Sequence, residues 1–164
     1  GTNVMIFMIF IGATAFSYVF RALGGDDIIA DFFDSLGIGP AGVVFLMMAA
    51  VFAMGFFFDW LEIILIAVPV FTPIIENIDF SSHVAQGDFL TWFAIIIAVN
   101  LQTSYLTPPF GYALFFIKGG SPDSVRMQQI YKGCVPFVVL QLIGLTAIVM
   151  YPELSLWLPG LMSR

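Results

Sequence analysis

The residues best suited to binding chemistry lie between Asn100 and Gly111, in the segment NLQTSYLTPPFG. This segment places three hydroxyl side chains and two adjacent prolines inside an apolar run from Phe89 to Ile117. Pro108 and Pro109 each remove a backbone donor and disfavour the helical conformation of the preceding residue, so a helix has to break here. Such a break is tolerated in a membrane where it is buried in protein or lines a polar cavity. We therefore predict a binding site at this break.

The hydroxyls of Thr103, Ser104 and Thr107 are suited to line such a cavity. We expect two half-helices around an extended centre. A half-helix that ends near Asn100 points its carbonyl end at the gap, which favours a cation, and a half-helix that starts near Phe110 offers its positive end to an anion.

A second candidate is the acidic pair Asp59 and Glu62, near the centre of an otherwise apolar stretch from Ala41 to Ile75. Intramembrane acids are rare and mark ion pathways or conformational locks, which is the role we predict for Asp59. The plainer interpretation is a solvated turn between two ordinary spans, and Glu62 could equally pair with a partner helix. Because no solvated loop is recognisable, we predict a re-entrant helical hairpin whose tip spans Met54 to Leu61, with Gly55 providing the tight backbone.

The composition indicates an integral membrane protein. The chain has 164 residues, of which 60% are hydrophobic and 10% charged, whereas soluble domains carry about 25% charged residues. The net charge is −6 without a basic cluster, so no nucleic-acid partner is expected. The single cysteine, Cys134, excludes an internal disulfide and is expected to be an apolar filler. Without a His-containing triad, a metal-ligand cluster or a nucleotide loop, we expect neither an enzyme nor a bound cofactor.

The elements that must position these residues follow from the hydropathy pattern. Val4 to Phe20 predicts a packing span, and Gly24 to Gly39 alternates acids with apolar residues as in a helix lying along the membrane surface, jointed by glycines at both ends. His83 lies in a polar connector and is expected to be a surface residue. Gly133 to Tyr151 predicts the last span. Because the chain starts without Met, we expect it to be a piece of a longer polypeptide.

The charged loops suggest an orientation. Lys118, Arg126 and Lys132 lie on the side opposite the acidic arm and the C-terminus. The positive-inside rule then puts these three residues in the cytoplasm and the C-terminus on the opposite side of the membrane.

The predicted fold is all-α and spans the membrane. It comprises a scaffold helix and interfacial arm (1–39), the re-entrant hairpin of a transport domain (40–76), a broken transmembrane helix (77–119), and a connector, final helix and tail (120–164). This order is typical of one inverted repeat of a secondary transporter, in which a hairpin tip and a broken helix meet near the midplane. The other repeat should lie in the N-terminal half of the same subunit.

Two stretches, MGFFFDWLEIILIAVPVFTPII and NLQTSYLTPPFGYALFFIKG, resemble the large membrane subunit of the tripartite ATP-independent periplasmic (TRAP) transporters. The resemblance covers nearly the whole chain as the C-terminal part of that subunit. It implies a sodium-coupled importer of the bacterial inner membrane that works by an elevator motion. The implied partners are a small membrane subunit and a soluble periplasmic protein that delivers an organic acid.

The resemblance also implies site residues. Sodium would be bound by backbone carbonyls and hydroxyls at Gly55, Thr103 and Thr107, because a hard cation prefers oxygen ligands from unwound helices. Ser104, Pro108 and Pro109 would contact the carboxylate substrate.

Two alternatives remain open. A non-transporting membrane scaffold would use the Pro-Pro break only as a packing kink. A proton-coupled carrier would depend on Asp59 and Glu62 instead of sodium.

Overall fold

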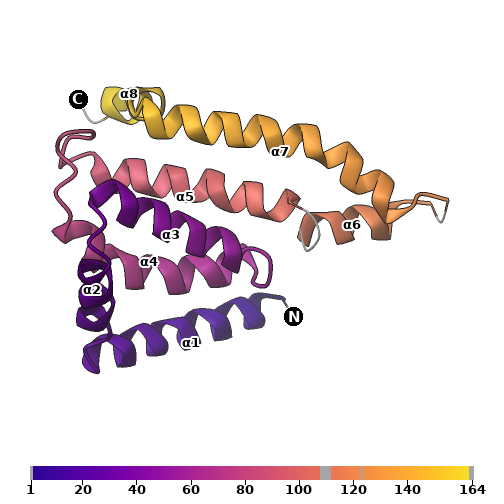
Figure 1. Cartoon of the computed structure of the whole chain (residues 1–164). Coiled ribbons are helices and arrows are strands. Elements are labelled where there is room, and N and C mark those ends of the chain that lie inside the picture. Colours follow the sequence, from indigo (N-terminus) through magenta and orange to yellow (C-terminus); the bar gives the residue numbers. More distant parts are fainter. Residues whose placement is uncertain (1, 108–111, 123, 163–164) are drawn as a thin grey trace. The chain divides into compact units, whose positions relative to one another are not determined.

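The computed structural model describes residues 2–107, 112–122 and 124–162, and every regular element in these ranges is an α-helix (Figure 1). This confirms the prediction of an all-α chain. The helices are α1 (Thr2–Ala22), α2 (Gly25–Ser35), α3 (Pro40–Met54), α4 (Trp60–Asn77), α5 (Phe89–Leu106), α6 (Tyr112–Gly120), α7 (Met127–Met150) and α8 (Glu153–Met162).

Three of these helices are long and apolar enough to cross a membrane: Val4–Ala22, Phe89–Leu106 and Met127–Met150. Helix α3 and the apolar part of α4, Trp60–Ile75, are shorter, and the two helices are separated by residues 55–59. The two helices and the intervening tip that the sequence predicts for this region are therefore present in the structure.

The chain forms two compact units. One comprises residues 1–47 and 58–79, and the other comprises residues 48–57 and 80–164. The division falls within α3, so the end of α3 that leads to Gly55 belongs with α5 to α8.

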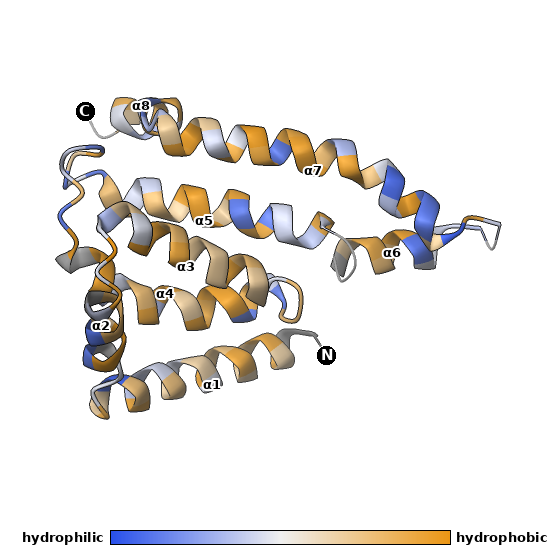
Figure 2. Cartoon of the chain, viewed as in Figure 1, coloured by the Kyte–Doolittle hydropathy of each residue, from blue (hydrophilic) through white to orange (hydrophobic). Residues whose placement is uncertain are grey.

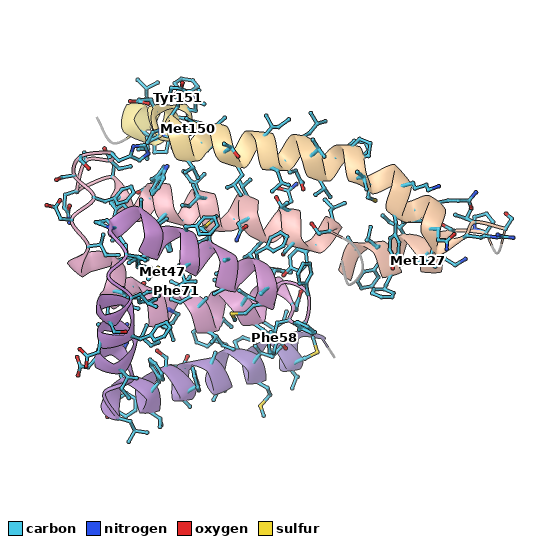
Figure 3. The ribbon with its side chains drawn as sticks, viewed as in Figure 1. Met47, Phe58, Phe71, Met127, Met150 and Tyr151 are labelled. Carbon is cyan, nitrogen blue, oxygen red and sulfur yellow. The ribbon has the colours of Figure 1, made fainter. Side chains whose placement is uncertain are left out.

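In the first unit, α1 packs against α4, and α2 packs against both. The interior includes Met47 of α3 and Phe71 of α4, which are labelled in Figure 3 and are 0% and 9% exposed. The amphipathic pattern of α2 buries Phe33 and leaves Asp31 exposed.

Glycine backbones flank α2 as the sequence predicts. Gly24 has φ of 74° and Gly37 has φ of 61°. This left-handed conformation is unfavourable for residues with a Cβ atom, so both ends of α2 depend on glycine to turn the chain.

In the second unit, α5 packs against α6, α7 and α8. The ribbon in Figure 1 shows α5 and α7 running side by side in opposite directions. Between α6 and α7, Leu114, Ile130 and Cys134 form a buried cluster. Cys134 is thus the apolar filler that the sequence predicts.

The start of α5 is tied to the end of α7. Nε1 of Trp92 donates to the carbonyl oxygen of Ile148 at 3.1 Å, and Nε2 of His83 lies 2.6 Å from the carbonyl oxygen of Val149. The last carbonyls of a helix have no intrahelical donor, and Pro152 has no N–H to offer Ile148. His83 is exposed, as predicted for a surface residue, but it also contacts α7.

The predicted break lies between α5 and α6, but its first boundary was wrong. Helix α5 continues through Asn100 to Leu106, and Thr107 leaves the helical region with φ of −84° and ψ of 121°. No proline or glycine lies between Asn100 and Leu106, so the helix persists until the residue before Pro108, which proline forces out of the α conformation. With 18 residues, α5 is about 27 Å long at 1.5 Å per residue, which is nearly a full span rather than a half-helix.

Candidate functional site

Polar side chains gather in the second half of α5, where Figure 2 shows its apolar character giving way to hydrophilic residues. Asn100 is 4% exposed, and Thr103 and Ser104 are 0% exposed. Burying such groups costs free energy unless they are hydrogen-bonded. Each of these three side chains therefore needs a hydrogen-bond partner inside the protein.

Ser104 packs directly against Gly55, the first residue after α3. A Cβ atom placed on Gly55 would lie 2.7 Å from the Cβ of Ser104 and closer still to its hydroxyl oxygen. Only a residue without a side chain fits this approach. The structure thus brings together two of the predicted site residues, which lie far apart in the sequence.

Asn100 fastens α5 to α3 at a second point. Its side-chain Nδ2 donates to the carbonyl oxygen of Met48 at 2.8 Å, and Asn100 is buried. The two contacts hold the end of α3 on the polar part of α5.

The hydroxyls of α5 are oriented by their own helix. Thr103 Oγ1 donates to Val99 O at 2.9 Å, and Ser104 Oγ donates to Leu101 O at 2.8 Å. A hydroxyl has one hydrogen and two acceptor lone pairs, so each oxygen keeps its lone pairs available after donating. Such oxygens can accept a hydrogen bond or bind a hard cation.

Thr107 ends α5 and completes the hydroxyl set. Its Oγ1 donates to Thr103 O at 2.7 Å, and its backbone N–H donates to Ser104 O at 3.2 Å. The carbonyl end of α5 carries partial negative charge, which favours a cation. Pro108 and Pro109, predicted as substrate contacts, lie outside the described residues.

Asp59 and Glu62 have a structural role that the sequence analysis missed, although their spacing is that of a capping box. Asp59 is the N-cap of α4: its Oδ1 accepts from Trp60 N at 2.9 Å, and Glu62 Oε2 accepts from Asp59 N at 3.4 Å. The two acids therefore form a capping box. The pathway role predicted for Asp59 stays a prediction.

Among the described residues, no group of three His, Cys, Asp or Glu side chains could hold a metal ion. The chemistry available at the α3 and α5 contact is that of neutral oxygens from hydroxyls and carbonyls. The sequence analysis identified Asn100 as the start of the polar segment but missed its hydrogen bond to Met48. The only sequence signal for that bond is an amide side chain within an apolar run.

The sequence matches the family model described as the DctM component of the tripartite ATP-independent periplasmic transporters, over residues 1–154. The chain belongs to this family. The resemblance carried by the FFFDW and TPPFG segments is thereby confirmed. Membership also agrees with the apolar helices in making the chain part of a multi-pass membrane protein.

Relatives in the DctM family carry transporter names. The large permease protein of a sialic acid TRAP transporter from Vibrio cholerae is 24% identical over 160 residues, covering 98% of this chain and 35% of that protein. An ectoine/5-hydroxyectoine TRAP transporter large permease protein from Ruegeria pomeroyi is 26% identical, covering 98% of this chain and 36% of that protein. A putative dicarboxylate transporter subunit from Paracoccus pantotrophus is 27% identical, covering 96% of this chain and 70% of that protein.

The chain spans about a third of the length of the Vibrio and Ruegeria proteins. No solved structure matches it. The relatives are named as permeases or as a transporter subunit, which agrees with the prediction that the chain is not an enzyme.

Proposed function

We propose that the chain is the C-terminal repeat of a sodium-coupled secondary transporter that imports a small organic acid by an elevator motion. Its partners are the N-terminal half of the same subunit, a small membrane subunit and a periplasmic substrate-binding protein. The protein lies in the bacterial inner membrane with its C-terminus in the periplasm. Helix α1 and the arm α2 belong to the scaffold, whereas α3, α4, α5 and α6 belong to the transport domain.

The observation that carries this proposal is the close, buried approach of Gly55 to the hydroxyl residue Ser104, near the end of a helix long enough to span a membrane. A helix that is only kinked for packing does not require the three buried polar side chains that α5 carries, Asn100, Thr103 and Ser104. Broken helices that present carbonyls and hydroxyls are the usual ion sites of secondary transporters.

Sodium fits the available ligands. The hydroxyls of Thr103 and Thr107 donate to helix carbonyls and keep lone pairs for a cation. We assign sodium to Gly55, Thr103 and Thr107, and the carboxylate substrate to Ser104, Pro108 and Pro109. The N-terminus of α6, after the interruption, favours the anionic group.

The substrate class rests on the relatives, whose names specify sialic acid, ectoine or a dicarboxylate. We propose a small carboxylate-containing compound. A thermal-shift screen of the cognate binding protein against organic acids would identify it.

The test uses the full-length subunit with its partners in proteoliposomes. Thr103→Val and Thr107→Val each replace a hydroxyl with a methyl group of similar size. Each variant should raise the sodium concentration for half-maximal uptake by about tenfold, the effect of one interaction of ~1.4 kcal/mol. Thr146→Val is the matched control, because Thr146 Oγ1 also donates to the carbonyl four residues earlier but is exposed on α7.

The alternatives give different results in the same assay. A proton-coupled carrier would show uptake driven by a pH gradient without sodium, and neither threonine variant would change that uptake. Complete complexes that assemble but show no uptake under either gradient would favour the membrane scaffold.

A further inference from the structure

Two prolines in α4, Pro69 and Pro73, are four residues apart. In an α-helix each carbonyl accepts from the N–H four residues later, and proline has no N–H. Pro73 therefore leaves the carbonyl of Pro69 without its helical donor, and Pro69 does the same to the carbonyl of Leu65. These two carbonyls lie on one face of α4, one turn apart.

Arg21, in the last turn of α1, supplies a donor to one of them. Its Nη2 donates to Pro69 O at 2.8 Å, across the packed pair of α1 and α4. A carbonyl deprived of its donor is costly in an apolar environment, and an arginine in a membrane segment needs a partner such as a backbone carbonyl. One bond meets both requirements.

The carbonyls between the two acceptors keep their own donors, because residues 70, 71 and 72 are not proline. The carbonyl of Val68 in addition accepts Thr72 Oγ1 at 2.7 Å. Acceptors for Arg21 along this face of α4 are therefore discrete, with Pro69 O and Leu65 O separated by about 6 Å at 1.5 Å per residue.

We propose that Arg21 is a positioning residue and that α1 has two alternative axial positions along α4. In one position the guanidinium of Arg21 donates to Pro69 O, and in the other it donates to Leu65 O. The inference rests on the proposed function, in which α1 belongs to the scaffold and α4 to the moving domain. One-turn shifts of packed elements are an established form of two-state change. The described register, with Arg21 on Pro69, is one of the two states.

The register can be measured by electron-electron resonance in the full-length transporter, reconstituted in lipid nanodiscs with its native cysteines replaced. Spin labels are attached to Tyr18→Cys on α1 and Ile64→Cys on α4, since both side chains are exposed, at 76% and 38%. Two distance populations that differ by several ångström are expected.

The proline variants should shift the two populations in opposite directions. Pro73→Ala returns a helical donor to Pro69 O and should disfavour the described register by about tenfold. Pro69→Ala returns a donor to Leu65 O and should favour the described register by a similar factor. Arg21→Met should abolish both shifts, and Arg21→Lys should restore part of them.

Pro136→Ala in α7 is the matched control, because it also replaces a proline inside a helix. It should leave the ratio unchanged. A single distance population, shifts of the same direction in both α4 variants, or shifts that persist with Arg21→Met would each overturn the proposal. Because the populations are measured without uptake, a failure of sodium coupling in the transport assay is distinguishable from a failure of this register.

Discussion

Replacing Gly55 by alanine tests whether the contact between α3 and α5 is as close as the structure shows. The added Cβ would lie 2.7 Å from the Cβ of Ser104, inside van der Waals contact. Ser104 cannot move aside freely, because it is 0% exposed and its hydroxyl donates to Leu101 O at 2.8 Å. Either α3 must shift or Ser104 must give up its bond.

The magnitude follows from these two outcomes. Overpacking a tight contact costs about 1–3 kcal/mol, and a lost hydrogen bond costs about 1 kcal/mol. The gain of up to ~1 kcal/mol that alanine has over glycine applies within a helix, and Gly55 lies in the turn that follows α3. Gly55→Ala should therefore lower the free energy of unfolding by about 1–3 kcal/mol. Gly144→Ala, on α7 with no atom within 4 Å of its Cβ, should be neutral or stabilising.

The assay is unfolding of the purified full-length transporter in detergent, followed by intrinsic fluorescence. The double variant Gly55→Ala with Ser104→Gly removes the clashing side chain from the opposite helix. It should recover part of the loss, with a coupling free energy of ~1 kcal/mol or more. The reasoning would be refuted if Gly55→Ala behaved like Gly144→Ala, or if the two changes at the contact were additive.

Three further substitutions test single contacts. Asn100→Leu removes the donor to Met48 O while keeping the branched shape of the side chain, and should reduce stability by ~1 kcal/mol and also reduce the uptake rate. Unchanged uptake would show that the bond to Met48 is dispensable for transport. Trp92→Phe keeps an aromatic ring but loses the bond to the carbonyl of Ile148, and hydrogen exchange at the end of α7 should rise by about fivefold, the effect of ~1 kcal/mol. Asp59→Asn should keep the cap of α4, whereas Asp59→Ala should cost ~1 kcal/mol; an uptake defect already present with asparagine would assign the carboxylate charge a role in the ion pathway.

Hydropathy and breaker residues predicted most of the helices, but not α8, which lies in the predicted tail. Apolar length predicted the spans of α1 and α7, and the prolines predicted the separation of α5 from α6. The error near Asn100 has a physical cause. The prediction places the start of the break at the first polar side chain, yet hydroxyls can bond to the preceding turn and remain helical, as Thr103 does with Val99 O.

The candidate site was predicted only in part. The sequence pointed to Gly55 and to the hydroxyls of α5, and the structure adds that the hydroxyl residue facing Gly55 is Ser104. The assignment of sodium to Gly55, Thr103 and Thr107 stays a prediction. Neighbouring residues on a helix point about 100° apart, so the choice between Thr103 and Ser104 depends on the rotation of α5 about its axis. Hydropathy does not determine that rotation when the helix is apolar on all sides.

The chemistry of proline explains both the helix ends that were predicted and the hydrogen bonds that were missed. Read along the chain, a proline indicates where a helix ends or bends, and by the same chemistry it identifies a carbonyl four residues earlier that needs another donor. Pro73 marks the carbonyl of Pro69, which Arg21 contacts, and Pro152 marks the carbonyl of Ile148, which Trp92 contacts. The acceptors are therefore readable from sequence spacing alone, whereas the donors lie 48 and 56 residues away and are found only once the helices are packed.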